Sequence, residues 1–278
     1  MPYPASNVKP YLNILCYGEA GSGKTTFAAS AQKHPKMRNV IVLNVEGGLL
    51  SIAGVPGVEV EDVHSVQDLE DIFWKLANKE KGYDHFQTVV IDSATEVQTL
   101  DLEHAARDGW DREQKKPEKE RKRKSVDNLF QADYGENTTR LKRVFRWFRD
   151  APFNTIYTAL LKREFEKLPV GSERTPELVS VRPLFTEKLG MAVEGYVDAC
   201  WYLYSDNVPV SDEEGAPTVA KRFILTQPEG VFRAKTRGHR FAEALGKVVE
   251  NPDLAKIYDL LISTEVPSNN TKKEKASA

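Results

Sequence analysis

One stretch of the chain reads Leu12-Asn13-Ile14-Leu15-Cys16-Tyr17-Gly18-Glu19-Ala20-Gly21-Ser22-Gly23-Lys24-Thr25-Thr26. An apolar strand leads directly into Gly-x-x-x-x-Gly-Lys-Thr, and a helix-forming run, Phe27-Ala28-Ala29-Ser30-Ala31, follows it. Glycine lets successive backbone N–H groups curl around a phosphate, and the helix that starts near Gly23 points its positive end at the same anion. The pattern therefore predicts a phosphate-binding P-loop.

The residues of this loop have separate expected roles. Lys24 is expected to reach the β- and γ-phosphates of a nucleotide, and the Thr25 hydroxyl is expected to bind Mg²⁺. A glycine-rich turn that matches by chance is the alternative, but the strand before it and the helix after it disfavour that reading. The predicted nucleotide-binding residues are Gly18, Glu19, Ala20, Gly21, Ser22, Gly23, Lys24, Thr25 and Thr26.

The composition is ordinary for a soluble globular protein. The 278 residues are 40% hydrophobic and 9% aromatic with a net charge of −2, so any nucleic-acid binding must come from local basic patches. Cys16 and Cys200 lie in apolar runs and are expected to be buried free thiols. We found neither a signal peptide nor an apolar run of about 20 residues, which predicts a cytoplasmic protein without a membrane span.

Two strands end in acidic residues that suit a P-loop. The run Val40–Val45 is followed by Glu46, and the run Thr88–Ile91 is followed by Asp92. Ligands of open α/β sheets bind at the carboxyl ends of strands, so Asp92 is expected on the Mg²⁺ side and Glu46 opposite the γ-phosphate. Glu46 could also be a solvated turn residue. Since Ser93 follows Asp92, the water-activating acid is not its immediate neighbour, and Glu96 is the reserve candidate for that role.

A strongly basic stretch runs from Arg112 to Lys124, with eight basic residues, three acidic residues and no apolar one. We expect this basic insertion, at about residues 108–130, to stay out of the core. It is either a solvated mobile segment or an arm that contacts a nucleic-acid backbone. The candidate contacts in the second case are Lys122, Arg123 and Lys124.

A second candidate DNA segment is the run Leu161–Ser180, which shows no hydrophobic period and is expected to be a loop. Basic residues around an aromatic ring suit single-stranded nucleic acid, because cations follow the phosphates and the ring stacks on bases. An ordinary charged loop is the alternative, since nearby glutamates almost cancel the charge. The candidate contacts are Lys162, Arg163, Phe165, Lys167 and Arg174.

The remaining patterns complete an α/β domain over residues 11–262, between an N-terminal arm (1–10) and a disordered tail (263–278). Helices are expected at Ser65–Asn78, Ala94–Arg107, Asn137–Asp150, Pro183–Val193 and up to Ile262. Further strands are expected at Val58–Val63, Asn154–Leu160 and Val197–Tyr204, the last followed by a turn-rich hairpin connection. A closing antiparallel pair is expected between Arg222–Thr226 and Val231–Lys235.

The order of these motifs resembles the RecA ATPase core. After the P-loop come Val45-Glu46-Gly47, Ile91-Asp92-Ser93-Ala94 and a late hairpin ending in Ala234-Lys235-Thr236-Arg237. The chain is similar, more closely, to the shortened RecA-like proteins of bacteriophages of the Sak type, which act in single-strand annealing. Further segments of that resemblance are Asp133-Tyr134-Gly135, Pro183-Leu184-Phe185 and Gly195-Tyr196-Val197-Asp198, and the match covers roughly Tyr11 to Gly238.

The resemblance implies a RecA-like P-loop NTPase core, with a mostly parallel central sheet flanked by helices and a C-terminal antiparallel hairpin. It makes Glu46 the carboxylate that polarises the attacking water and Asp92 the acid on the Mg²⁺ side. Lys235 and Arg237 match the pair of cations that, in RecA-like assemblies, reaches the γ-phosphate bound by the neighbouring subunit.

The chain also departs from the RecA pattern. Thr158-Ala159-Leu160 stands where RecA relatives carry a glutamine that links the γ-phosphate to the DNA loop, which puts coupling of hydrolysis to DNA in question. The resemblance therefore leads us to expect a protein without the N-terminal polymerisation domain of cellular recombinases. The Phe-x-x-Ala run from Phe241 to Ala244 is as compatible with a helix face as with an assembly motif.

The leading functional hypothesis is an ATP- and Mg²⁺-dependent single-stranded DNA-binding and annealing protein of phage recombination, with slow ATP hydrolysis in a ring or filament. Its expected partners are single-stranded DNA, further copies of itself and a phage or host single-strand-binding protein, in the bacterial host cytoplasm. One alternative is a helicase-like or packaging-type motor, which usually needs a further DNA-engaging domain. The other is a nucleotide-dependent switch or loader that binds a protein partner.

Overall fold

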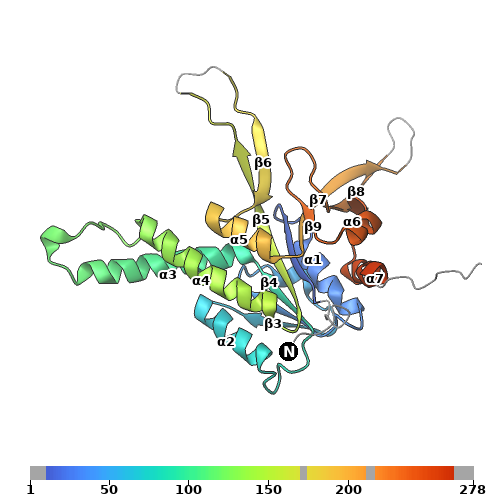
Figure 1. Cartoon of the computed structure of the whole chain (residues 1–278), viewed down its shortest axis with the longest axis horizontal. Helices are drawn as coiled ribbons and strands as arrows, with labels where there is room; N and C mark the ends of the chain where they lie inside the picture. The colour runs from blue at the N-terminus through green and yellow to red at the C-terminus, as the bar shows by residue number, and fades with distance from the viewer. Residues whose placement is uncertain (1–10, 170–173, 211–216, 266–278) are drawn as a thin grey trace, which may run out of the picture.

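The fold is built on a ten-stranded β-sheet (Figure 1). The structure is a computed structural model that describes residues 11–169, 174–210 and 217–265. Six neighbouring strands are parallel, in the order β7-β1-β5-β4-β2-β3. Their bounds are β1 Asn13–Gly18, β2 Val40–Asn44, β3 Val58–Asp62, β4 Thr88–Asp92, β5 Asn154–Phe165 and β7 Ala199–Pro209. The expected α/β fold with a mostly parallel central sheet is confirmed.

Helices cover both faces of the sheet (Figure 1). One face packs against α2 (Val66–Ala77), α3 (Ala94–Gln114), α4 (Gln131–Asp150) and α5 (Glu187–Tyr196). The other face packs against α1 (Lys24–Ala29), α6 (His239–Leu245) and α7 (Leu254–Glu265). Short 3₁₀ turns are η2 (Ser30–Lys33), η3 (Leu49–Ile52) and η4 (Glu118–Glu120). Because both faces are covered, the β-branched runs of the inner strands are fully buried.

Both terminal segments of the chain include residues that the structure does not describe. The N-terminal arm (1–10) lies outside the described residues, and so does the predicted tail from residue 266 onward. The last helix, α7, continues to Glu265, three residues past its expected end. No helix in the described ranges combines the length and the apolar character that a membrane crossing requires.

An antiparallel hairpin extends the sheet beyond β7. β7 pairs along one edge with β1 over Ala199–Tyr202, and its opposite edge pairs with β8 (Thr218–Leu225) from Tyr202 to Pro209. The strand β10 (Val248–Glu250) pairs with the other edge of β8, and β9 (Lys235–Thr236) pairs with the start of β7. The C-terminal antiparallel hairpin is thus confirmed, but the expected pairing of 222–226 with 231–235 is wrong.

A second hairpin rises from the end of β5, where the sequence predicted a loop. β5 continues to Phe165 and pairs antiparallel with β6 (Leu178–Pro183). In Figure 1 this β5–β6 hairpin projects from the body of the domain. The loop prediction is wrong for the described part of 161–180, because backbone pairing and a cross-strand ion pair between Arg182 and Glu164 stabilise these strands without an apolar period.

The basic insertion forms the far end of a helical pair. α3 and α4 lie side by side and project from the sheet, with the insertion joining them (Figure 1). Arg123 is only 6% exposed, so the expectation that the whole stretch avoids the core is wrong for this residue. Its guanidinium donates to both carboxylate oxygens of Asp133, at 2.7 and 2.8 Å, and this pairing is what makes the burial of its charge tolerable.

Candidate functional site

The P-loop connects β1 to α1 at the carboxyl edge of the parallel strands. Gly21 and Gly23 adopt φ values of 77° and 95°, in the left-handed region that other residues rarely occupy. Gly18 is needed for a different reason, since a Cβ atom there would lie 2.2 Å from the Leu203 carbonyl oxygen. The glycine spacing therefore corresponds to real backbone constraints at the end of β1.

Lys24 is held inside its own loop. Its Nζ donates to the carbonyl oxygen of Glu19 at 2.7 Å and to that of Gly18 at 3.3 Å. Burial lowers the pKa of Lys24, and the nearby Cys16, Glu46 and Asp92 groups act in the opposite direction. A buried ammonium whose hydrogen bonds to described residues go to carbonyl oxygens is well placed to take a phosphate oxygen as a ligand.

Two oxygen groups meet at the predicted metal position. The Thr25 hydroxyl donates to Asp92 Oδ2 at 2.7 Å, and Asp92 is 7% exposed at the end of β4. Mg²⁺ prefers hard oxygen ligands and is usually bound by one or two carboxylates together with nucleotide phosphates and water. Among the described residues, no cluster of three or more His, Cys, Asp or Glu side chains could form a metal cage. The Thr25 and Asp92 donors fit Mg²⁺ that is shared with a nucleotide.

Thr158 joins this pair from the neighbouring strand β5. Its buried hydroxyl donates to Asp92 Oδ1, so both oxygens of the carboxylate are engaged by threonines. The sequence showed Thr158 only as a departure from the RecA pattern. Its contact with Asp92 depends on the register between β4 and β5, which the sequence does not reveal.

The two candidate bases both lie near the P-loop. The backbone N–H groups of Val45 and Glu46 donate to the Asp92 carbonyl oxygen at 2.8 and 3.2 Å, which fixes the end of β2 against the end of β4. Glu46 is exposed, and its charge acts on both Lys24 and Glu96. The pKa of Glu96 is raised, first by burial and then by the charges of Glu46 and Glu103. Glu46 and Glu96 therefore both remain candidates for the base that activates the attacking water.

Lys235 and Arg237 lie far from the P-loop of their own chain. β9 pairs with the first residues of β7, at the amino ends of the parallel strands, whereas the P-loop follows their carboxyl ends. Lys235 Nζ donates to two carbonyl oxygens at the end of α5, at 2.5 and 2.8 Å, and Arg237 pairs with Asp198 at 2.9 Å. Burial, followed by the charge of Arg237, lowers the pKa of Lys235. Their proposed action on a neighbouring subunit's nucleotide stays a prediction.

The DNA candidates of the β5–β6 hairpin are near the nucleotide loop. Arg163 forms an ion pair with Glu19 of the P-loop, and Phe165 is 53% exposed. Lys162 pairs with Glu164 at 3.3 Å, Arg174 pairs with Glu166 at 3.2 Å, and Lys167 is exposed. The hairpin therefore presents an aromatic ring and several cations beside the ATP-site candidates.

The DNA candidates of the α3–α4 segment divide into two kinds. Lys122 and Lys124 are exposed and remain available at the surface. Arg123 is buried in its ion pair with Asp133, so its charge does not reach a ligand at the surface. We therefore remove Arg123 from the candidate DNA contacts.

Sequence reasoning missed Arg222, which lies on β8 against the P-loop. A Cβ atom at Gly23 would come within 2.7 Å of Arg222 Nε. Arg222 lies in a strand that contains both polar and apolar residues, and no sequence motif around it indicates a role in nucleotide binding.

The chain was compared with known proteins. A search of curated proteins found no match. A family model described as "AAA domain" matches residues 11–238, a range that includes the P-loop, Glu46, Asp92 and the Lys235–Arg237 segment. Since this match covers most of the chain and the P-loop lies where such a sheet binds nucleotides, the chain belongs to the AAA domain family of P-loop ATPases.

Proposed function

We propose that this ATPase is a Mg²⁺-dependent single-stranded DNA-binding and annealing protein of the phage Sak type, active in the cytoplasm of a bacterial host. The observation that carries the proposal is the ion pair between Glu19 and Arg163. It joins the nucleotide loop directly to the β5–β6 hairpin, so a change in one can alter the position of the other. Such a contact gives ATP binding a direct physical route to the DNA-binding hairpin.

The β5–β6 hairpin has the chemistry that single-stranded DNA needs. The exposed ring of Phe165 can stack on a base, and base–aromatic stacking contributes about 1–3 kcal/mol per base. Arg163 and Lys167 are close in sequence to this ring and can follow the phosphates. The Arg163–Glu19 and Lys162–Glu164 ion pairs are partly exposed to solvent, and such pairs are weak enough to exchange for phosphate contacts.

The P-loop residues supply the chemistry on ATP. Lys24 binds phosphate oxygens, and the Thr25 hydroxyl with the Asp92 carboxylate orients the metal side of the site. When bound, Mg²⁺ neutralises charge on the β- and γ-phosphates. Glu46 accepts a proton from the attacking water, with Glu96 as the alternative base. Because Lys235 and Arg237 are remote from this site, we assign them to the nucleotide of the next subunit in a ring or filament.

The test is a filter-binding titration of the full chain with labelled single-stranded DNA, in ATP, in ADP and without nucleotide. We expect tighter binding in ATP, and we expect Phe165→Ala to weaken it roughly five- to 150-fold, which corresponds to one lost stacking contact. Val179→Ala is the matched control, because Val179 is an exposed apolar residue of β6 in the same hairpin.

The other outcomes separate the alternatives. No DNA binding in any nucleotide state would contradict the proposal and favour a nucleotide-dependent switch or loader. Rapid ATP turnover with directional strand separation would indicate a motor. An annealing assay with complementary oligonucleotides, with and without a single-strand-binding protein, then tests the annealing step and the predicted partner.

A further inference from the structure

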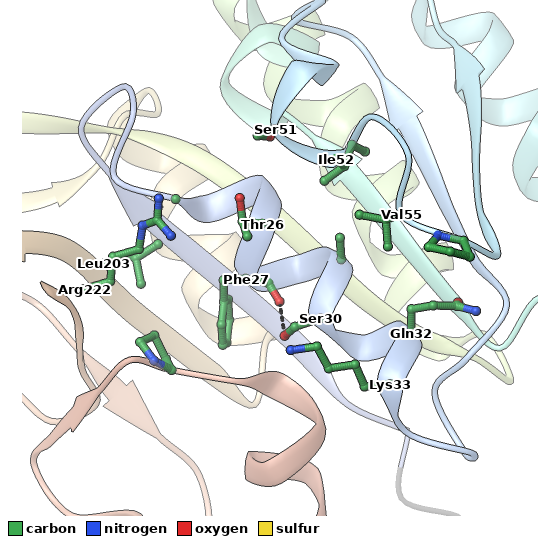
Figure 2. A pocket seen from close by; sticks show the side chains of 14 residues that line it. Thr26, Phe27, Ser30, Gln32, Lys33, Ser51, Ile52, Val55, Leu203 and Arg222 are labelled. Atoms are coloured by element: carbon green, nitrogen blue, oxygen red, sulfur yellow. Dashed lines mark hydrogen bonds between the residues drawn. The ribbon is translucent and has the colours of Figure 1, made fainter. Parts of the chain in front are cut away.

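A cavity lies along the exposed side of α1 and begins at the P-loop (Figure 2). It encloses about 390 Å³ and is lined by Gly23 and Thr26 at the P-loop end. Figure 2 shows Leu203 and Arg222 on one side of the helix and Ser51, Ile52 and Val55 on the other. Neither Thr25 nor Asp92, at the metal side of the P-loop, lines this cavity.

The strand register directs Arg222 towards this cavity. Residues that face each other in an antiparallel pair point to the same side of the sheet, and Arg222 is paired with Ser205. Leu203 and Ile224 share that side and are buried in the cluster that contains α1. Lys221, one residue earlier on β8, points to the opposite side.

Arg222 lies directly over the glycine that precedes Lys24. A Cβ atom at Gly23 would be 2.7 Å from Arg222 Nε and 2.8 Å from its Cδ. The absence of a side chain at Gly23 therefore serves two purposes, the left-handed backbone of the loop and the close approach of this arginine. The guanidinium is consequently next to the loop that binds phosphates.

The positive charge of Arg222 has no acidic partner within the described ranges. Its side chain is exposed and forms neither an ion pair nor a hydrogen bond with described residues. The other cation that lines the cavity, Lys33, pairs with Asp253 at 2.6 Å, and no described lining residue is acidic. An uncompensated guanidinium at the mouth of such a cavity favours an anionic ligand.

We infer that Arg222 is a nucleotide-binding residue that acts within its own subunit, on the α-phosphate side of ATP and ADP. This inference rests on the proposed ATP-binding function. If Lys24 binds the β- and γ-phosphates and Thr25 with Asp92 holds the Mg²⁺ beside them, the α-phosphate and nucleoside would extend past Thr26 towards the cavity that this residue lines. Arg222 stands at that exit, between Gly23 and the cavity. Through it, the β7–β8 hairpin contributes to nucleotide affinity.

The experiment is isothermal titration calorimetry of the full chain with ADP and with a non-hydrolysable ATP analogue. We expect Arg222→Ala to weaken both ligands by the same factor, roughly tenfold or more, because one charged hydrogen bond is lost from each complex. Arg222→Lys should restore part of the affinity, since a point charge replaces the guanidinium fork. Lys221→Ala is the matched control, because it removes the same charge from the opposite side of β8 and should leave both affinities unchanged.

Each other result has a definite meaning. Unchanged ADP affinity in Arg222→Ala overturns the inference, and so does a loss confined to the ATP analogue, which would place the contact at the γ-phosphate. If Arg222→Ala melts at a lower temperature than the parent, the nucleotide affinities of Arg222→Gln are compared with those of the parent instead. This variant keeps most of the side-chain stem. Absence of ADP binding by the parent would overturn the proposed function as well, so the two failures are distinguishable.

Discussion

Arg123 offers the sharpest test of the structure, because the sequence placed it in a solvated basic arm. Its guanidinium donates to both oxygens of Asp133 and to two backbone carbonyls, at 2.9 and 3.2 Å. It also lies 4.6 Å from the centre of the Phe130 ring. The side chains of Arg123 and Asp133 are 5% and 1% exposed, so removing the arginine leaves a buried carboxylate without its partner.

We expect Arg123→Ala to lower the free energy of unfolding by about 3–5 kcal/mol, the usual effect of breaking one side of a buried ion pair. In urea, an m-value of about 2–3 kcal/mol/M converts this loss into a midpoint about 1–2.5 M lower. Urea unfolding followed by circular dichroism measures that shift. Lys124→Ala is the control, because Lys124 is the exposed neighbour and its removal should change stability by less than about 0.5 kcal/mol.

The double variant Arg123→Met, Asp133→Leu separates the ion pair from general disruption. With both charges gone, most of the lost stability should return. A deficit of about 1 kcal/mol should remain, because Asp133 also accepts the Phe130 N–H at 2.7 Å at the start of α4. Equal urea midpoints for Arg123→Ala and Lys124→Ala would refute this reasoning and would indicate that the Arg123 side chain is exposed to solvent.

Three further predictions concern the ATP site. Lys24→Ala should abolish ATP binding and leave the melting temperature almost unchanged, because the hydrogen bonds that Lys24 donates to described residues go to loop carbonyls and not to the core; calorimetry and a thermal melt measure the two effects. Glu46→Gln should keep ATP binding and lose hydrolysis in a phosphate-release assay, and if Glu96→Gln does so instead, Glu96 is the base. Mixing inactive Glu46→Gln with inactive Arg237→Ala should restore some hydrolysis; no rescue, with activity strictly linear in protein concentration, would argue against action between subunits.

The local patterns of the sequence were sufficient for the parallel part of the fold. A strand that runs into Gly-x-x-x-x-Gly-Lys-Thr predicts both the P-loop and the helix after it, because glycine φ angles and helix polarity are properties of a few consecutive residues. Apolar runs that end in Glu46 and Asp92 likewise predict buried parallel strands with acids at their carboxyl ends. These features depend on short-range chemistry, and the structure places Asp92 next to Thr25 as the motif implied.

Contacts between distant segments could not be predicted in this way. Thr158 reaches Asp92 from 66 residues away, and Arg222 lies against Gly23 from strand β8, so both contacts depend on sheet order and register. The same is true of Arg123, whose charge predicts solvent exposure unless a buried partner is available. The sequence by itself determined which residues are predicted to bind phosphate. The tertiary structure alone decided which charges surround them, because pairing energy depends on distance and burial and not on position along the chain.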